Sequence, residues 1–241
     1  MYWEREVRAG NTIEVKRYHT GRARPRGQPR QKRYSETTFS QEEVNRKNAE
    51  DMLRWLLNTN FGYGDYHIVL NYQREPCDPY RTFDEMRCDV SRFIRNLKRR
   101  YLNEGKEMKY IYVIEVGEKS SRHTHVVLNG ISIKLIQDCW QFGRITCTPL
   151  DRSGDYRRLG NDLLKYSDNT FRNVGAAMKT RYSRSRNLQL PNIRKTLIKK
   201  ASTYRKLPVA KKGYEIIADT VEYGVDNFGY PFMKYSMVRL E

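Results

Sequence analysis

One stretch of the sequence, from Tyr110 to Gly130, constrains the fold more than any other. It contains two runs of β-branched and aromatic residues joined by a polar turn near Lys119, which is the pattern of an antiparallel hairpin. Side chains alternate between faces along a strand, so His123 and His125 are expected on one face. A turn symmetric about Lys119 places Glu115 opposite His123 on that same face.

This carboxylate and these two imidazoles could together bind a divalent metal ion. The alternative is a structural role, because a buried histidine is commonly a hydrogen-bonded core residue. The chain has only 4 His, and two of them on one face opposite a carboxylate favour the metal site. The zinc-protease pattern His-Glu-x-x-His is absent. Mixed imidazole and carboxylate ligands suit Mn²⁺ or Mg²⁺.

The elements around the hairpin predict an α+β fold with a ferredoxin-like, RRM-like antiparallel sheet and a β-α-β-β-α-β core. Apolar residues recur at three and four positions between Phe83 and Glu104, which indicates an amphipathic helix. A further helix is expected at about residues 156–168. The other predicted core elements are a strand at 66–72, a helix at 132–140 and a strand at 143–148.

Several motifs resemble one known superfamily. A strand ending in Glu115, then a turn, then His123-Thr-His125 resembles the metal motif of the HUH endonucleases, which include rolling-circle replication initiators and relaxases. That superfamily has a nuclease domain of the predicted fold and carries its His-x-His on a central strand. The resemblance covers about residues 60–190. It extends to initiators of Firmicutes plasmids and phages related to filamentous-phage gene II protein through the segments Ile68–Tyr72, Trp140–Gly143 and Ser185–Pro191.

The resemblance implies a metal-dependent endonuclease and strand transferase that nicks single-stranded DNA at a replication origin through a 5′-phosphotyrosine. Members with one tyrosine carry it on the helix after the fourth strand, often as Tyr-x-x-Lys. Aligning Lys165 with that lysine places Asp162 at the tyrosine position, and Tyr166 follows one turn later, about 6 Å along the axis.

Three interpretations of this helix stay open. Tyr166 is a shifted nucleophile, or Asp162 is a natural or engineered inactivating change, or Asp162 adds an oxygen ligand to the metal. Lys165 lies one helical turn from Asp162 and is expected on the same face. An ordinary half-buried tyrosine is the alternative role for Tyr166. Tyr156, at the start of the helix, is a further candidate nucleophile.

The chain is strongly basic, with Lys+Arg 46 against Asp+Glu 28 and a formal net charge of +18. Such a charge indicates a polyanionic partner, and nucleic acid is favoured because there is no amphipathic basic helix with an extended apolar face. Residues 20–34 are rich in Pro, Gly and Arg and predict an arm that contacts DNA, with a solvated linker as the alternative. The candidate DNA-binding residues are Arg22, Arg24, Arg26, Arg30, Lys32 and Arg33, together with Arg122 in the hairpin.

The predicted organisation has three parts. Residues 1–58 hold an N-terminal strand, the arm and a helix beginning at Ser40; residues 60–190 form the nuclease domain. Residues 191–241 form a basic helix at 193–205 and a closing hairpin, packed on the core.

The same sequence favours some partners and excludes others. No P-loop motif is present, so unwinding is expected from a host or separate helicase. The sequence has no membrane-spanning run, signal peptide or Cys-x-x-Cys spacing, which predicts a cytoplasmic protein and no membrane partner. The resemblance leaves a plasmid, a phage or an integrative element open as the source. A non-catalytic single-strand-binding protein on the same sheet is the main alternative function, and a metal-dependent RNA-processing enzyme is a third.

Overall fold

The computed structural model describes residues 1–19, 39–73, 81–117, 122–174, 180–199, 207–225 and 230–240. The six basic residues of the predicted arm, from Arg22 to Arg33, lie outside these ranges. Residues 49–189 form one unit, and residues 1–48 and 190–241 together form the other. Each unit contains its own five-stranded sheet.

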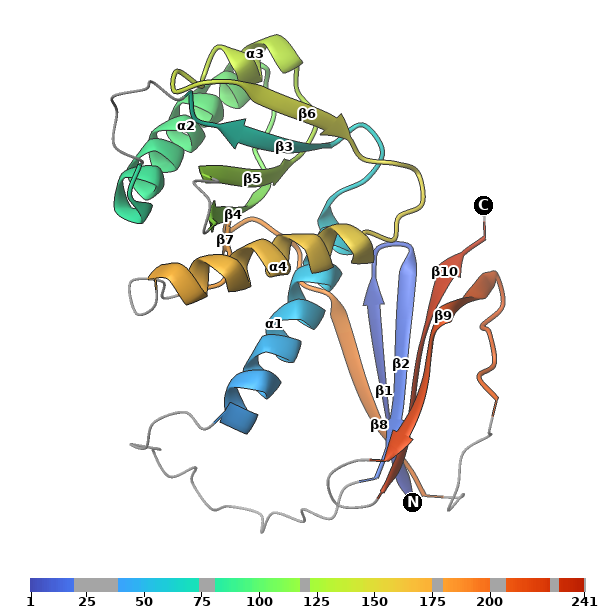
Figure 1. Cartoon of the computed structure of the whole chain (residues 1–241). Coiled ribbons are helices and arrows are strands. Elements are labelled where there is room, and N and C mark those ends of the chain that lie inside the picture. The colour runs from blue at the N-terminus through green and yellow to red at the C-terminus, as the bar shows by residue number, and fades with distance from the viewer. Residues whose placement is uncertain are drawn as a thin grey trace, which may run out of the picture. The chain divides into compact units, whose positions relative to one another are not determined.

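The sheet of the 49–189 unit confirms the predicted ferredoxin-like fold. All its pairings are antiparallel, and the strand order is β6-β3-β5-β4-β7, where β7 (Ser183–Arg184) extends the β4 edge (Figure 1). Without β7, this is the sheet order of a β-α-β-β-α-β split motif. Its elements are β3 (Tyr66–Asn71), α2 (Phe83–Asn103), β4 (Tyr110–Val116), β5 (Arg122–Leu128), α3 (Ile133–Gln137) and β6 (Ile145–Pro149).

Helices cover both faces of this sheet. On one face, α2 and α3 pack against Ile68 and Val126 through apolar residues that include Phe93 and Leu97. On the other face, α1 (Phe39–Asn60) and α4 (Arg157–Val174) form a separate apolar cluster. That second cluster includes Leu53, Leu56, Leu57, Ile111, Val113, Val127, Leu163 and Leu164. The alternation of apolar residues along β4 and β5 thus supplies both cores.

The start of α2 is fixed by a capping box. The Thr82 hydroxyl accepts a hydrogen bond from the Glu85 backbone N–H at 3.3 Å, and the Glu85 carboxylate accepts one from the Thr82 N–H at 2.8 Å. These two bonds satisfy backbone donors that a helix start leaves unpaired. The predicted helix over 83–104 is confirmed as α2, Phe83–Asn103.

The second unit is built on an antiparallel sheet of order β8-β1-β2-β10-β9. The closing hairpin predicted near the end of the sequence is confirmed by the pairing of residues 214–225 with residues 231–239, and the predicted N-terminal strand is present at residues 2–9. One face of the sheet is apolar and buried, with Ile13, Val15, Met233, Tyr235 and Met237 at its centre. The strands are β1 (Tyr2–Ala9), β2 (Thr12–Tyr18), β8 (Asn192–Ile198), β9 (Tyr214–Val225) and β10 (Pro231–Arg239).

The prediction of a basic helix over residues 193–205 is wrong. Residues 192–198 form strand β8, which pairs with β1 from Asn192 opposite Arg8 to Ile198 opposite Tyr2. Residues 200–206 lie outside the described part of the chain. A ladder to a strand nearly two hundred residues earlier satisfies the backbone groups, and Ile193, Thr196 and Ile198 are β-branched residues that favour strands.

Candidate active site

The hairpin of β4 and β5 has the predicted register. Glu115 lies opposite His123, and Val113 lies opposite His125. The Thr124 side chain is fully buried, on the face opposite the two histidines. The predicted turn residue Lys119 lies outside the described residues. The histidines therefore share the face that α1 and α4 cover.

The closest contact at the site joins Glu115 and His125. The Glu115 Oε2 and His125 Nε2 atoms are 3.0 Å apart, and the His125 side chain is only 6% exposed. Two donor atoms in adjacent octahedral positions, each about 2.1 Å from one ion, also lie about 3 Å apart. The pair therefore fits either a hydrogen bond or two ligands of a divalent cation.

His123 stands farther from this pair. Its ring centroid is 6.5 Å from that of His125, and its Nδ1 atom is buried without a hydrogen-bond partner among the described residues. Burial lowers the pKa of His123, against the opposing effect of Glu115, and so favours the neutral imidazole, the form that binds metals. Within the described residues, no three His, Cys, Asp or Glu side chains lie close enough to hold a metal ion.

A third histidine, His67 on β3, joins the site and was not predicted. Its ring stacks on His125 with centroids 5.6 Å apart and planes 17° from parallel. Burial, and to a lesser degree His125, lower the pKa of His67 to about 4. Its Nε2 atom is buried without a partner among the described side chains. Alternation with the buried Ile68 and Leu70 was the sequence signal that could have placed it on this face.

Helix α4 brings Tyr166 onto the same group. The Tyr166 ring lies parallel to that of His125, with centroids 4.1 Å apart and an angle of 6° between planes. Burial raises the pKa of Tyr166, and the negative charges of Asp162 and Glu115 raise it further. Tyr166, Asp162 and Glu115 are therefore electrostatic neighbours, as the helical spacing of residues 162 and 166 requires.

The other predicted residues of α4 are placed differently. Lys165 and Asp162 are both exposed, and Lys165 is not among the charges that shift the Tyr166 pKa. Tyr156 is buried, and its hydroxyl donates a hydrogen bond to the Asp151 carbonyl at 2.9 Å. Burial raises the pKa of Tyr156 to about 12. Its hydroxyl is thus engaged in holding the loop before α4.

Two side chains near the end of α4 fix the helix to the edge of β4. The Thr170 hydroxyl accepts a hydrogen bond from the Val116 N–H at 2.9 Å and donates one to the Ile114 carbonyl at 2.8 Å. The Asn173 amide donates to the Val116 carbonyl at 2.7 Å. These bonds set the position of α4 along β4, and therefore the position of Tyr166 relative to Glu115.

The predicted DNA-binding residue Arg122 lies at the start of β5, and strand alternation puts it on the face opposite His123. Its guanidinium donates to the carbonyls of Arg81 at 3.2 Å and Gly117 at 3.0 Å. The structure therefore does not bring Arg122 together with the histidines.

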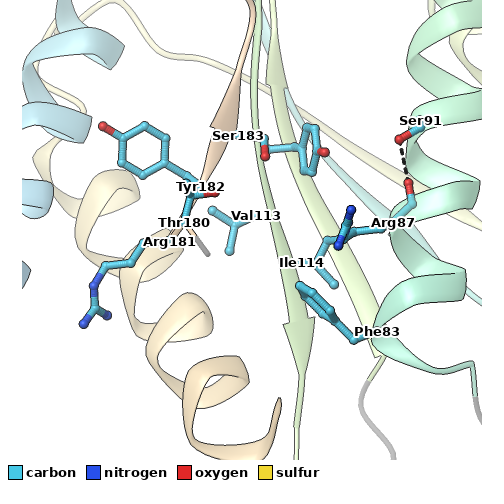
Figure 2. A pocket seen from close by; sticks show the side chains of 10 residues that line it. Phe83, Arg87, Ser91, Val113, Ile114, Thr180, Arg181, Tyr182 and Ser183 are labelled. Atoms are coloured by element: carbon cyan, nitrogen blue, oxygen red, sulfur yellow. Dashed lines mark hydrogen bonds between the residues drawn. The ribbon is translucent and has the colours of Figure 1, made fainter. Parts of the chain in front are cut away.

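A pocket of about 330 Å³ lies near the β4–β7 edge and is separate from the histidine cluster. Figure 2 shows that Phe83 and Arg87 enter it from α2, facing Ile114 of β4. Arg181, which also lines it, is paired with Asp168 and lies 5.6 Å from the centre of the Phe171 ring. His125, Glu115 and Tyr166 are not among its lining residues.

Comparison with known proteins gives one positive result. Residues 65–171 match a family of replication-associated proteins, described as the ORF2 and gene II protein type. This match confirms the resemblance to gene II-type initiators, and it includes β3, the β4–β5 hairpin and α4 as far as Phe171. No curated protein and no solved structure matches the chain.

Proposed function

We propose that this protein, whose residues 65–171 match the replication-associated family of the ORF2 and gene II protein type, nicks and rejoins single-stranded DNA to initiate rolling-circle replication. The observation that carries the proposal is the convergence of a carboxylate, an imidazole and a phenol. Glu115 lies 3.0 Å from His125, and the Tyr166 ring stacks on His125 at 4.1 Å. A metal-assisted phosphoryl transfer needs ligands and a nucleophile in this proximity.

The proposed cation, Mn²⁺ or Mg²⁺, would be held by Glu115, His125 and His123. The first two have the spacing of adjacent ligands, and His123 lies on the same face of the sheet, opposite Glu115. Carboxylate and imidazole donors suit these ions. When bound, such an ion polarises the scissile phosphate and offsets the charge that develops on its oxygens.

The proposed nucleophile is Tyr166. Its phenolic oxygen attacks phosphorus, the bond from phosphorus to the 3′ oxygen breaks, and that oxygen takes up a proton to leave a free 3′ hydroxyl. The chain then carries a 5′-phosphotyrosine, which the 3′ hydroxyl of an incoming strand can attack in the reverse reaction. The phenol must lose its proton for the first step, and Asp162 is the exposed neighbouring carboxylate that can accept it.

The metal part of the proposal is tested with a double substitution. His123→Ala combined with His125→Ala should abolish cleavage of a labelled oligonucleotide library in Mn²⁺, while oligonucleotide binding in EDTA stays close to that of the wild type. His19→Ala is a matched control, because that histidine belongs to the other unit. Normal cleavage by the double variant contradicts the proposed metal site.

A second candidate function is single-strand binding without cleavage. It is favoured by Asp162, which occupies the position where the family resemblance places a tyrosine. An anionic carboxylate is a poor replacement for a phenol, because it repels a phosphate and forms an acyl phosphate that hydrolyses. Retention of oligonucleotides without covalent adducts, in the presence of Mn²⁺, supports this function over the enzyme.

The proposed partners and location follow from the same function. The nuclease acts on origin DNA, supplied as a single strand by a separate helicase, and the cytoplasm is the proposed compartment. No helix in the described ranges is long and apolar enough to cross a membrane. The basic residues from Arg22 to Arg33 and Arg122 remain proposed DNA contacts. A deletion of residues 22–33 that leaves the salt dependence of binding unchanged contradicts a role for the arm.

A further inference from the structure

The outward side of α2 carries a row of three arginines. Arg92, Arg95 and Arg99 follow one another at three and four positions, which places them within about 60° of arc on one side of a helix. All three are exposed. The opposite side of the same helix is buried in the core through residues that include Phe93 and Leu97. Each residue rises 1.5 Å, so the row extends about 10.5 Å along the helix axis.

This part of α2 contains basic residues but no acidic ones. Residues 90–103 include no Asp or Glu, and their basic residues are Arg92, Arg95, Lys98, Arg99 and Arg100. Within the described part of the chain, the side chains of Arg95, Lys98 and Arg99 form no ion pair or hydrogen bond. Arg92 does have neighbours, because it lies 5.9 Å from the centre of the Phe142 ring and is attracted by the Asp89 carboxylate.

The first turns of the same helix differ from the row. There Arg87 lies 3.3 Å from Asp84, an ion pair between residues three positions apart. Opposite charges at three or four positions stabilise an exposed helix, and like charges at that spacing destabilise it. Arg95 has a like charge at three positions before it and at four positions after it. An anionic ligand on the outward side of α2 would offset this repulsion.

A pocket of about 380 Å³ lies at the end of the row that Arg99 occupies. Most of the side chains that line it are hydrogen-bond donors, namely Asn96, Arg99, Arg100, Asn103 and Gln141. One carboxylate, that of Asp138, lines it as well. Arg, Asn and Gln side chains are among the groups that donate to phosphate oxygens in protein–DNA contacts. The pocket therefore suits a phosphate group at one end of the row.

The side chains of this surface favour a duplex over a single strand. Single strands bind where aromatic rings are available to stack on unpaired bases. The exposed residues of α2 from Ser91 to Asn103 include no aromatic residue, and the Phe142 ring beside the row is faced by the guanidinium of Arg81 at 5.2 Å. A duplex carries one charge per 1.7 Å of its axis, so the row can face about six phosphates. A membrane is disfavoured, because the apolar side of α2 is buried in the core.

We propose that the α2 row, defined by Arg92, Arg95 and Arg99, binds the phosphate backbone of duplex DNA that flanks the nicked strand. The row is separate from the candidate active site, because α2 packs on one face of the sheet and the histidines lie on the face that α1 and α4 cover. The choice of DNA over RNA rests on the proposed function, whereas the binding of a duplex rests on the charges and side chains of α2.

Binding is tested on the full chain with a labelled DNA duplex of about 20 base pairs in EDTA, so that no cleavage occurs. The triple variant Arg92→Gln, Arg95→Gln, Arg99→Gln should lower the slope of log affinity against log salt by roughly 2.7, which is three lost duplex contacts. Replacing the same three arginines with lysine keeps the charges and should keep the slope. Both Gln and Lys favour helices, so α2 is retained in both variants. A slope that is unchanged in the glutamine variant, or equally reduced in the lysine variant, overturns the proposal.

The charge-matched control replaces three exposed arginines of the same unit that lie outside α2. It is the triple variant Arg158→Gln, Arg184→Gln, Arg186→Gln. The net charge falls by the same amount as in the α2 variant, so a general electrostatic effect would change both slopes alike. We expect a clearly smaller change in the control. Equal changes overturn the α2 row as the binding surface.

Two other nucleic acids of equal length identify the ligand. The glutamine variant of α2 should lose more affinity for the DNA duplex than for single-stranded oligothymidine or for an RNA duplex of the same sequence. A larger loss for either of these overturns the assignment to duplex DNA. Covalent adducts with a short single-stranded oligonucleotide in Mn²⁺ report separately on the nuclease. Adducts should form equally in the glutamine variant and the wild type, and their absence from both contradicts the nuclease without changing the duplex result in EDTA.

Discussion

The phenol ring of Tyr166 lies parallel to the imidazole of His125, with centroids 4.1 Å apart and an angle of 6° between the planes. The contact joins a helix residue to a strand residue and places the candidate nucleophile beside a candidate ligand. Removing only the hydroxyl tests the role of Tyr166, because Tyr166→Phe keeps the ring stack. We expect the yield of covalent DNA adducts to fall below about one-thousandth of wild type, while stability changes by less than about 0.5 kcal/mol.

Two further variants decide between the candidate nucleophiles. Tyr156→Phe should retain adducts and lose about 1 kcal/mol of stability, because the Tyr156 hydroxyl bonds the Asp151 carbonyl. Asp162→Tyr introduces a tyrosine at the position where the family resemblance implies one. Adducts that form only in Asp162→Tyr, measured by gel shift under denaturing conditions, would reassign the nucleophile from Tyr166 to residue 162.

Glu115 should contribute strongly to metal affinity. Its carboxylate lies 3.0 Å from the Nε2 atom of His125, the spacing expected of two ligands on one ion. We expect Glu115→Gln to weaken Mn²⁺ binding by about 100-fold or more, measured by calorimetry, because a neutral amide oxygen is a weaker ligand for a hard cation. Glu107→Gln, at an exposed position before β4, is the matched control. Comparable affinities for the two variants would exclude Glu115 as a ligand.

Replacing His67 is expected to raise the stability of the protein and to lower its activity. Its buried Nε2 atom has no partner among the described residues, and an unpaired buried polar atom costs about 1–3 kcal/mol. We therefore expect His67→Leu to raise the free energy of unfolding in urea by about 1 kcal/mol without metal. The same change removes the ring that stacks on His125 at 5.6 Å, so adduct yield should fall. If His67→Leu is less stable than the wild type, the His67 Nε2 atom has a hydrogen-bond partner in the native protein.

Much of this site could be predicted from the sequence. The parts that could not be predicted share one physical reason. The Glu115–His123 pairing follows from strand alternation and a symmetric turn, which are local properties of the chain. The contact of His67 with His125 depends on how β3 aligns with β5, a pairing between segments about sixty residues apart. Strand β8 was mistaken for a helix for the same reason, since its partner β1 lies at the other end of the sequence.

The capping box of α2 offers a stability test outside the site. Thr82→Ala removes the hydroxyl that accepts from the Glu85 N–H at 3.3 Å. We expect a loss of about 1 kcal/mol in the free energy of unfolding, the usual cost of losing an N-cap. Thr82→Ser keeps an accepting hydroxyl and should stay within about 0.5 kcal/mol of wild type in urea titrations. Equal losses in both variants would contradict the cap.

Asp65 should make the free energy of unfolding depend on pH. Its carboxylate accepts hydrogen bonds from the Gly62 and Gly130 N–H groups at 2.8 Å each, yet burial raises its pKa overall. A carboxyl with a native pKa above its unfolded value binds protons more readily when folded. The stability of wild type relative to Asp65→Asn should therefore increase as pH falls from 7 through the raised pKa. A relative stability that decreases over that range, in urea titrations, contradicts the burial effect.

The hydrogen bonds from Thr170 and Asn173 to β4 have a consequence for the protein in concentrated solution. An uncovered outer strand offers its backbone groups to any extended chain and so invites aggregation. Beyond the short pairing with β7, the Ile114 and Val116 backbone groups are taken by α4 side chains. Thr170→Val should therefore leave that edge open to intermolecular strand addition. The same two residues that set the position of α4 along β4 therefore also occupy backbone groups through which another chain could add a strand.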